Sequence, residues 1–82
     1  MNLYFEFEER RVTAAVDWPK DGHTITVHLN DARLTRELPT DLLFEIESNR
    51  KVAFEIEDQH NKRLIELQRV IARRLQEFAN KS

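Results

Sequence analysis

The chain has 82 residues, of which 40% are hydrophobic, with no cysteine and a formal net charge of −2. This length allows one domain, residues 1–82, and the absence of thiols excludes disulfides, cysteine nucleophiles and thiolate zinc sites. No apolar run approaches the roughly 18 residues that cross a bilayer, and the acidic start of the chain does not resemble a secretory signal. We therefore expect a cytoplasmic protein without membrane contact.

A change in the phase of alternation marks the first strand pair. Leu3, Phe5 and Phe7 are apolar at odd positions, whereas the apolar residues of 12–18 fall on even positions. Because a slip of one residue reverses the face that a strand presents, the segment 8–11 must contain a tight turn or a bulge. It lacks the Gly, Asn or Asp that two-residue hairpins favour. An uninterrupted strand of about fifteen residues is nevertheless rare, so we favour the turn.

A second turn and a short helix follow along the chain. The run 18–22 combines Pro with Asp-Gly, which is typical of a turn, and leads into an alternating strand over about 23–29. Residues 31–38 are predicted to be helical, with an Asn-Asp pair available as the cap and a following proline as the stop. Leu34 and Leu38 are four residues apart and would both face the core.

Two further alternating segments, 42–47 and 52–57, predict a hairpin around a turn at 48–51. Alternate residues of each segment are apolar and should point inward, while the intervening residues, mostly glutamates, should point outward. The residues predicted to point inward are Leu42, Phe44, Ile46, Val52, Phe54 and Ile56.

One long amphipathic helix is predicted over 58–80. The range 59–79 contains no Gly or Pro, and Asp58 is suited to the N-cap position. About twenty residues with a rise of 1.5 Å each span about 30 Å, enough to cross a sheet. Apolar residues spaced by three or four form one stripe that would cover the sheet: Leu64, Leu67, Ile71, Leu75 and Phe78.

Together these elements predict an α+β fold with two layers. A mostly antiparallel sheet of four to five strands, in the order β-β-β-short α-β-β-α, is covered by the long C-terminal helix. Residues 1–57 supply the sheet and the short helix near 31–38, and residues 58–80 supply the cover. The order of the strands in space does not follow from the pattern.

The sequence contains no motif for catalysis, cofactor binding or metal binding. His23 and His28 are five residues apart on one strand and so face opposite sides, and His60 has a leucine at i+4. The single glycine cannot build a phosphate-binding loop, and no serine lies in a nucleophile elbow. We therefore expect a protein that is not an enzyme, with no cofactor, metal or small-molecule substrate.

Charge is unevenly divided along the chain. Residues 1–58 carry seven Lys/Arg and thirteen Asp/Glu, a net charge of −6, whereas residues 59–82 carry six and two, a net charge of +4. The glutamates of the predicted strands could form an acidic surface for a basic partner, a site for a hard cation, or an ordinary solvated face. They are Glu6, Glu8, Glu45, Glu47, Glu55 and Glu57.

The apolar arc of the helix is wider than a sheet requires. It spans about 200°, against about 100° for a helix that covers one face. Ile65, Ala72 and Ala79 form the extra flank on one edge, and Val70 lies on the other. Curvature of the sheet, the short helix or a second copy could fill this excess. With Arg69 and Arg73 beside it, this flank is our expected contact surface for a protein partner, a homodimer through the helix being one form of it.

Nucleic-acid binding is the alternative function. Lys62, Arg69 and Arg73 fall on one side of the helix, away from the apolar stripe, and could contact phosphates. The acidic pI of about 5.9 and the interrupting Glu66 and Glu77 weigh against this interpretation. The leading hypothesis is therefore a small non-enzymatic protein–protein interaction module.

Overall fold

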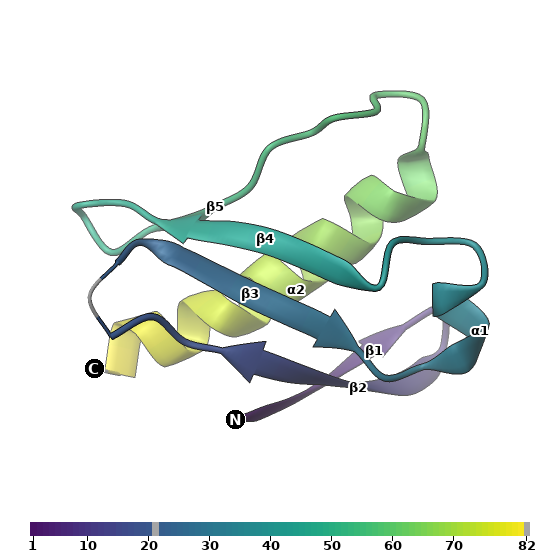
Figure 1. Ribbon diagram of the computed structural model, residues 1–82, viewed down its shortest axis with the longest axis horizontal. Coiled ribbons are helices and arrows are strands. Elements are labelled where there is room, and N and C mark those ends of the chain that lie inside the picture. The colour runs from purple at the N-terminus through teal and green to yellow at the C-terminus, as the bar shows by residue number, and fades with distance from the viewer. Residues whose placement is uncertain (21, 82) are drawn as a thin grey trace.

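Five antiparallel strands form one curled sheet in the computed structural model, which describes residues 1–20 and 22–81 (Figure 1). Each strand pairs with the one before it, so the spatial order is β1-β2-β3-β4-β5. The strands are β1 (Asn2–Phe7), β2 (Arg10–Asp17), β3 (Thr24–Leu29), β4 (Asp41–Ile46) and β5 (Val52–Ala53).

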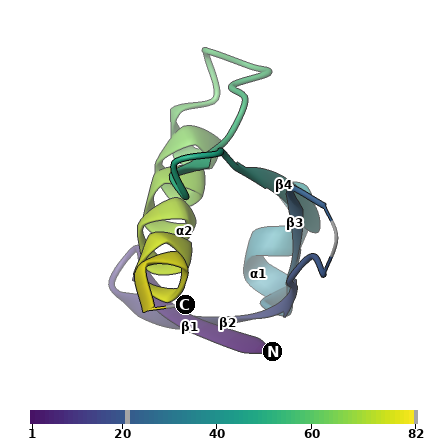
Figure 2. The same ribbon diagram turned by 90° about the vertical axis from the view of Figure 1, so that its left-hand side faces the viewer.

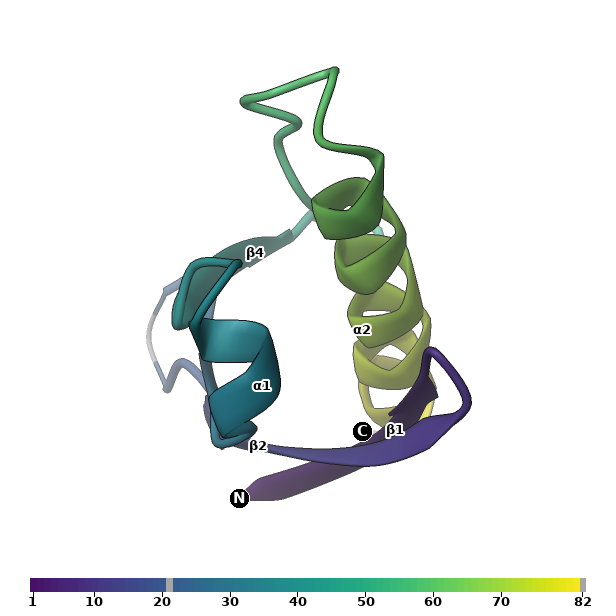
Figure 3. The same cartoon turned by 90° about the vertical axis from the view of Figure 1, so that its right-hand side faces the viewer.

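The C-terminal helix α2 (Lys62–Lys81) lies across the hollow of this sheet (Figure 2). It packs against β1 on one side and β5 on the other, so it joins the two ends of the sheet. The short helix α1 (Ala32–Thr35) lies at one end of the hollow (Figure 3). This arrangement confirms the predicted α+β fold, and the curvature of the sheet explains why α2 needs an apolar arc wider than one stripe.

The core follows the alternation of the strands and the period of α2. Every residue in it is less than a tenth exposed, and the described strands contribute from their inner faces only. Its members are Leu3, Phe5, Phe7, Val12, Ala14, Val16, Ile25, Val27, Leu29, Leu34, Leu38, Leu42, Phe44, Val52, Leu67, Ile71, Leu75 and Ala79. Leu64 and Phe78, which were predicted to cover the sheet, are only partly buried at the edge of this cluster.

The turn between β1 and β2 is confirmed and consists of Glu8 and Glu9. Phe7 pairs with Arg10, so two residues make the connection. The backbone of both glutamates adopts the left-handed conformation, with φ of 52° at Glu8 and 61° at Glu9, as a type I′ hairpin requires. Asn and Gly usually occupy these positions because a left-handed residue with a side chain costs about 1–2 kcal/mol. The register that buries both strands therefore overrides the unsuitable composition of the turn.

The second hairpin is shorter than predicted. β5 ends at Ala53, and Ile56, which was predicted to face inward, is 43% exposed. Phe54 does turn inward, where its ring meets that of Phe44 edge-on with centroids 5.9 Å apart. Beyond Phe54 the chain leaves β4 and rises to the start of α2, so Ile56 has no inner face to occupy (Figure 1).

The start of α2 also differs from the prediction. The helix begins at Lys62, and Asn61 caps it, because its Oδ1 accepts a hydrogen bond from the Leu64 N–H at 3.1 Å. Asp58 was the wrong choice of cap. Its Oδ1 accepts from the His60 N–H at 3.0 Å and shapes the turn that precedes the helix.

Candidate functional site

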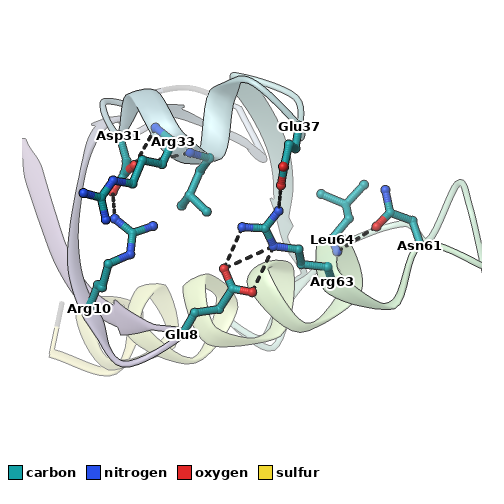
Figure 4. A network of polar contacts seen from close by, with 9 residues as sticks. Glu8, Arg10, Asp31, Arg33, Glu37, Asn61, Arg63 and Leu64 are labelled. Atoms are coloured by element: carbon teal, nitrogen blue, oxygen red, sulfur yellow. Dashed lines mark hydrogen bonds and ion pairs between the residues drawn. The ribbon is translucent and has the colours of Figure 1, made fainter.

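Arg63 links three segments at one end of the molecule (Figure 4). Its Nε and Nη2 donate to the two Glu8 carboxylate oxygens at 2.9 and 2.7 Å, and its Nη1 donates to Glu37. The hydrogen bond from Arg63 lowers the pKa of Glu8, and the same bond raises the pKa of Arg63. The left-handed turn is therefore tied to the first turn of α2 and to the segment after α1.

Asp31 and Arg10 form a second link at the same end. Asp31 caps α1 by accepting from the Arg33 and Leu34 N–H groups at 2.9 and 3.2 Å, and Arg10 donates to it at 3.0 Å. Burial alone would raise the pKa of Asp31, but these donors outweigh it and the pKa is lowered. A carboxyl group kept ionised in this way is a structural anchor, since a general acid at neutral pH needs a raised pKa.

The histidines do not come together. His28 shares a hydrogen bond of 2.6 Å between its Nδ1 and Asp41 Oδ1 on the outer face of the sheet, whereas His23 and His60 are exposed elsewhere. Within residues 1–20 and 22–81, no three His, Asp or Glu side chains are grouped as metal ligands would be. No helix in this part of the chain has the length and apolar character needed to span a membrane.

The predicted helix flank is partly covered by the sheet. Ile65 and Ala72 are half-buried, whereas Arg69 and Arg73 are exposed. By helical geometry this flank lies on the side of α2 that carries Gln76, whose side chain binds the segment around β5. The structure therefore brings the four predicted contact residues onto neighbouring sides of one helix, but it leaves little free apolar surface there.

The three cations of the alternative prediction do share one exposed side of α2. Lys62, Arg69 and Arg73 point away from the sheet, and none of them forms an ion pair with another described residue. Glu66 and Glu77 lie on the same outer side by the helical period, and Glu77 is engaged by Arg74 at 2.5 Å.

Polar side chains of α2 cap the edges of the sheet, a role that the sequence analysis missed. Arg74 Nε donates to the Tyr4 carbonyl of β1 at 3.1 Å. Gln76 Oε1 accepts from the Val52 N–H of β5 at 2.8 Å. Gln68 is only 8% exposed, and its Nε2 donates to the Glu55 carbonyl at 3.4 Å. The sequence signal was the placement of Gln68 and Gln76 eight residues apart along one border of the apolar stripe.

A cleft of about 390 Å³ opens beside β4, which we call the β4 cleft. Its walls are β4 and the chain that leaves β5, and α2 contributes Leu64 and Gln68. Two of the large apolar residues that are most exposed, Leu43 at 61% and Ile56 at 43%, lie on β4 and on that departing chain. The cleft is lined by Thr24, Pro39, Asp41, Leu42, Leu43, Glu45, Ala53, Phe54, Glu55, Glu57, Leu64 and Gln68.

The structure sorts the predicted acidic residues into separate groups. Glu45, Glu55 and Glu57 line the β4 cleft together with Asp41, which was not among the predicted set. Glu8 is instead bound by Arg63, and the exposed Glu6 lies near Arg11 and Arg74 beside β1. No His, Lys or Arg is among the described residues that line the β4 cleft, so the charged side chains of its lining are all acidic, and one of them, Asp41, shares a hydrogen bond with His28.

Comparison with known proteins adds no assignment. No protein-family model matches the chain, and neither a similar curated protein nor a similar solved structure was found.

Proposed function

We propose that this chain is a non-enzymatic protein–protein interaction module whose partner contacts the β4 cleft. The observation that carries this proposal is the combination of a concave surface, the exposed Leu43 and three carboxylates in one place; Glu45, Glu55 and Glu57 form no ion pair with another described residue. Exposed apolar surface with a polar rim is typical of interaction sites. A catalytic reading has less support, because the described residues that line the cleft include no histidine or cysteine to pair with the hydroxyl group of Thr24.

Site-specific photo-crosslinking tests this proposal. A photoreactive phenylalanine analogue placed at Leu43 should form a discrete adduct with one protein in the cells that naturally produce this chain. The same group at Tyr4, which is 52% exposed on β1, is the matched control and should form none. Adducts of equal yield and identity from both positions, or none from Leu43, would overturn the proposal.

Self-association through α2 is a separate form of the same proposal. Because Ile65 and Ala72 are half-buried, the packing favours the β4 cleft over the helix flank as the contact surface. Sedimentation velocity distinguishes the two. A dimer that Ile65→Glu dissociates would support the flank, and a strict monomer at high micromolar concentration would remove it.

A nucleic-acid-binding regulator is the second candidate, and the unpaired cations of α2 favour it. If Lys62, Arg69 and Arg73 contact three phosphates, the logarithm of the affinity for duplex DNA should fall with the logarithm of salt concentration with a slope of about −2.7. Fluorescence anisotropy between low and physiological salt measures this slope, and alanine at all three positions should abolish binding. No binding at low salt would eliminate the candidate.

A further inference from the structure

The backbone of β4 alternates between its two neighbours. The Thr40 carbonyl accepts from the Leu29 N–H at 2.8 Å, and the Ile46 N–H donates to the His23 carbonyl at 2.7 Å. Even-numbered residues of β4 therefore bond to β3, and the N–H and C=O groups of odd-numbered residues point the other way. The Glu47 N–H agrees with this alternation, because it donates to the Lys51 carbonyl at 2.8 Å, on the β5 side.

The neighbour on that other side is too short to cover β4. β5 pairs only Ala53 with Glu45 and Val52 with Ile46, and the chain then rises away from the sheet (Figure 1). The N–H and C=O groups of Asp41 and Leu43 consequently face the β4 cleft, with no strand beside them. An open strand edge of this kind is a template for pairing with another extended chain.

Side chains of α2 cover part of the outer edges of β1 and β5. Arg74 occupies the Tyr4 carbonyl on the outer edge of β1, and Gln76 occupies the Val52 N–H on the outer edge of β5. Proteins commonly cover their strand edges because uncovered ones aggregate. The uncovered length of β4, Asp41–Leu43, is the part of its edge that coincides with the β4 cleft.

We propose that β4 accepts an extended, basic segment of the partner as an added strand, by main-chain hydrogen bonds to Asp41 and Leu43. This inference rests on the function proposed above and specifies its partner chemistry. On the outer face, the added strand would run beside Asp41 and Leu43, which are both exposed, up to Glu45, which Ala53 of β5 already pairs. Directly opposite residues share a face, so the strand should present a cation opposite Asp41 and an apolar residue opposite Leu43. A second cation should follow where the segment passes the end of β5, beside the exposed Glu45 carboxylate.

The inner face of the added strand would point toward Phe54, Leu64 and Gln68. Phe54 and Leu64 are partly buried apolar residues at the border of the core, so the intervening positions of the segment should be apolar. The long contact of 3.4 Å between Gln68 Nε2 and the Glu55 carbonyl is weak for a hydrogen bond, which makes the Gln68 carboxamide available to the incoming chain. The expected core motif is therefore Arg-Val-Leu-Val-Lys or a chemical equivalent.

A second copy of this chain is a poorer occupant than a basic segment. Antiparallel pairing of two β4 edges around a two-fold axis at Leu43 would require Asp41 of each copy to lie opposite Glu45 of the other, a position that Ala53 of β5 already holds. Like charges directly opposite each other are destabilising. A cationic segment meets the same carboxylates with complementary charge, and Glu55 and Glu57 on the opposite wall add to the attraction.

Fluorescence anisotropy with a labelled peptide, Ser-Gly-Arg-Val-Leu-Val-Lys-Ser-Gly, tests the inference on the intact protein. Binding is expected, and replacement of both cations by Glu should abolish it. N-methylation of the central leucine blocks an N–H that would bond to the Leu43 carbonyl, and should weaken binding by at least about tenfold, a loss of about 1.4 kcal/mol. N-methylation of the first valine, whose N–H points away from β4, is the matched control and should have little effect.

Two pairs of protein variants complete the test. Leu43→Pro removes an N–H that faces the cleft and costs no ladder bond to β3, so edge geometry tolerates it, and peptide binding should fall at least about tenfold. Glu6→Pro, also at an outward-facing edge position but on β1, should bind normally. If Leu43→Pro fails to fold, Glu45→Lys replaces it, with Glu66→Lys on the far side of α2 as the control of equal charge change.

The outcomes separate this inference from the proposed function. Loss of binding in Leu43→Pro or Glu45→Lys, but not in their controls, supports strand addition. Equal binding by all variants, equal binding by both N-methylated peptides, or no peptide binding at all would overturn it. A protein crosslinked at Leu43 would still support the interaction module in those cases, whereas failure of that crosslink would remove both.

Discussion

The turn of Glu8 and Glu9 should be improvable by one substitution, Glu9→Gly. Glu9 is left-handed with φ of 61°, and its exposed side chain makes no polar contact with another described residue. Glycine removes a conformational cost of about 1–2 kcal/mol but adds about 0.5–1 kcal/mol of backbone entropy loss on folding. We expect a net gain of about 0.5–1 kcal/mol, which raises Tm by about 2–8 °C in a domain of this size.

Urea titration followed by circular dichroism measures this gain. Glu6→Gly, three residues earlier in the extended part of β1, is the matched control and should lose about 0.5–1 kcal/mol. The opposite signs test the backbone argument, because both variants remove one exposed glutamate. A loss of stability in Glu9→Gly similar to that in Glu6→Gly would refute the argument that the left-handed conformation is costly.

Glu8 provides a sharper version of the same test. Glu8→Gly relieves the same kind of backbone cost, since its φ is 52°, but it also removes the contact with Arg63. It should therefore gain less stability than Glu9→Gly. The difference between the two variants should shrink in an Arg63→Gln background, and a difference of unchanged size would show that Arg63 does not stabilise the turn.

Three further predictions concern the edge cap, the core and the acid range. Gln76→Ala should lower the free energy of unfolding by about 1–2 kcal/mol, because the Val52 N–H loses its acceptor. The control Gln59→Ala, in the exposed turn before α2, should change it by no more than about 0.5 kcal/mol. Equal losses for the two variants in urea titration would contradict the capping role of Gln76. Ile71 is fully buried, at 0% exposure, so Ile71→Ala should lower the free energy of unfolding, measured by thermal unfolding, by about 2–5 kcal/mol. A smaller loss would mean that the packing of the apolar stripe of α2 does not stabilise the helix on the sheet. Because the pKa of Asp31 is lowered in the folded protein, its ionised carboxylate stabilises the fold above the usual carboxyl range, and this stabilisation is lost as pH falls below about 4. Asp31→Asn should therefore make the free energy of unfolding depend less steeply on pH below about 4. An unchanged slope would refute the stabilising role of the carboxylate.

Much of the fold follows from local patterns. The period-2 alternation of Leu3, Phe5 and Phe7 determines which face of β1 is buried, because side-chain direction in a strand depends only on position along it. The change of phase after Phe7 required a break even though Glu8 and Glu9 are poor turn residues. Similarly, the shared side of Lys62, Arg69 and Arg73 follows from the helical period alone.

What the sequence could not determine depends on neighbours from distant segments. Where β5 ends is decided by the path from the sheet to α2, so Ile56 kept its strand-like pattern without a strand partner. Asn61 and Asp58 are equally good caps by composition, and only the start of packing against the sheet selects Asn61. The β4 cleft, the proposed contact site, exists because β5 stops before it covers Leu43. The alternation of apolar residues in β4 is a property of its own sequence and determined which face of the strand is buried. Whether an edge of β4 is free depends on the strand beside it, so only the tertiary structure decided that edge.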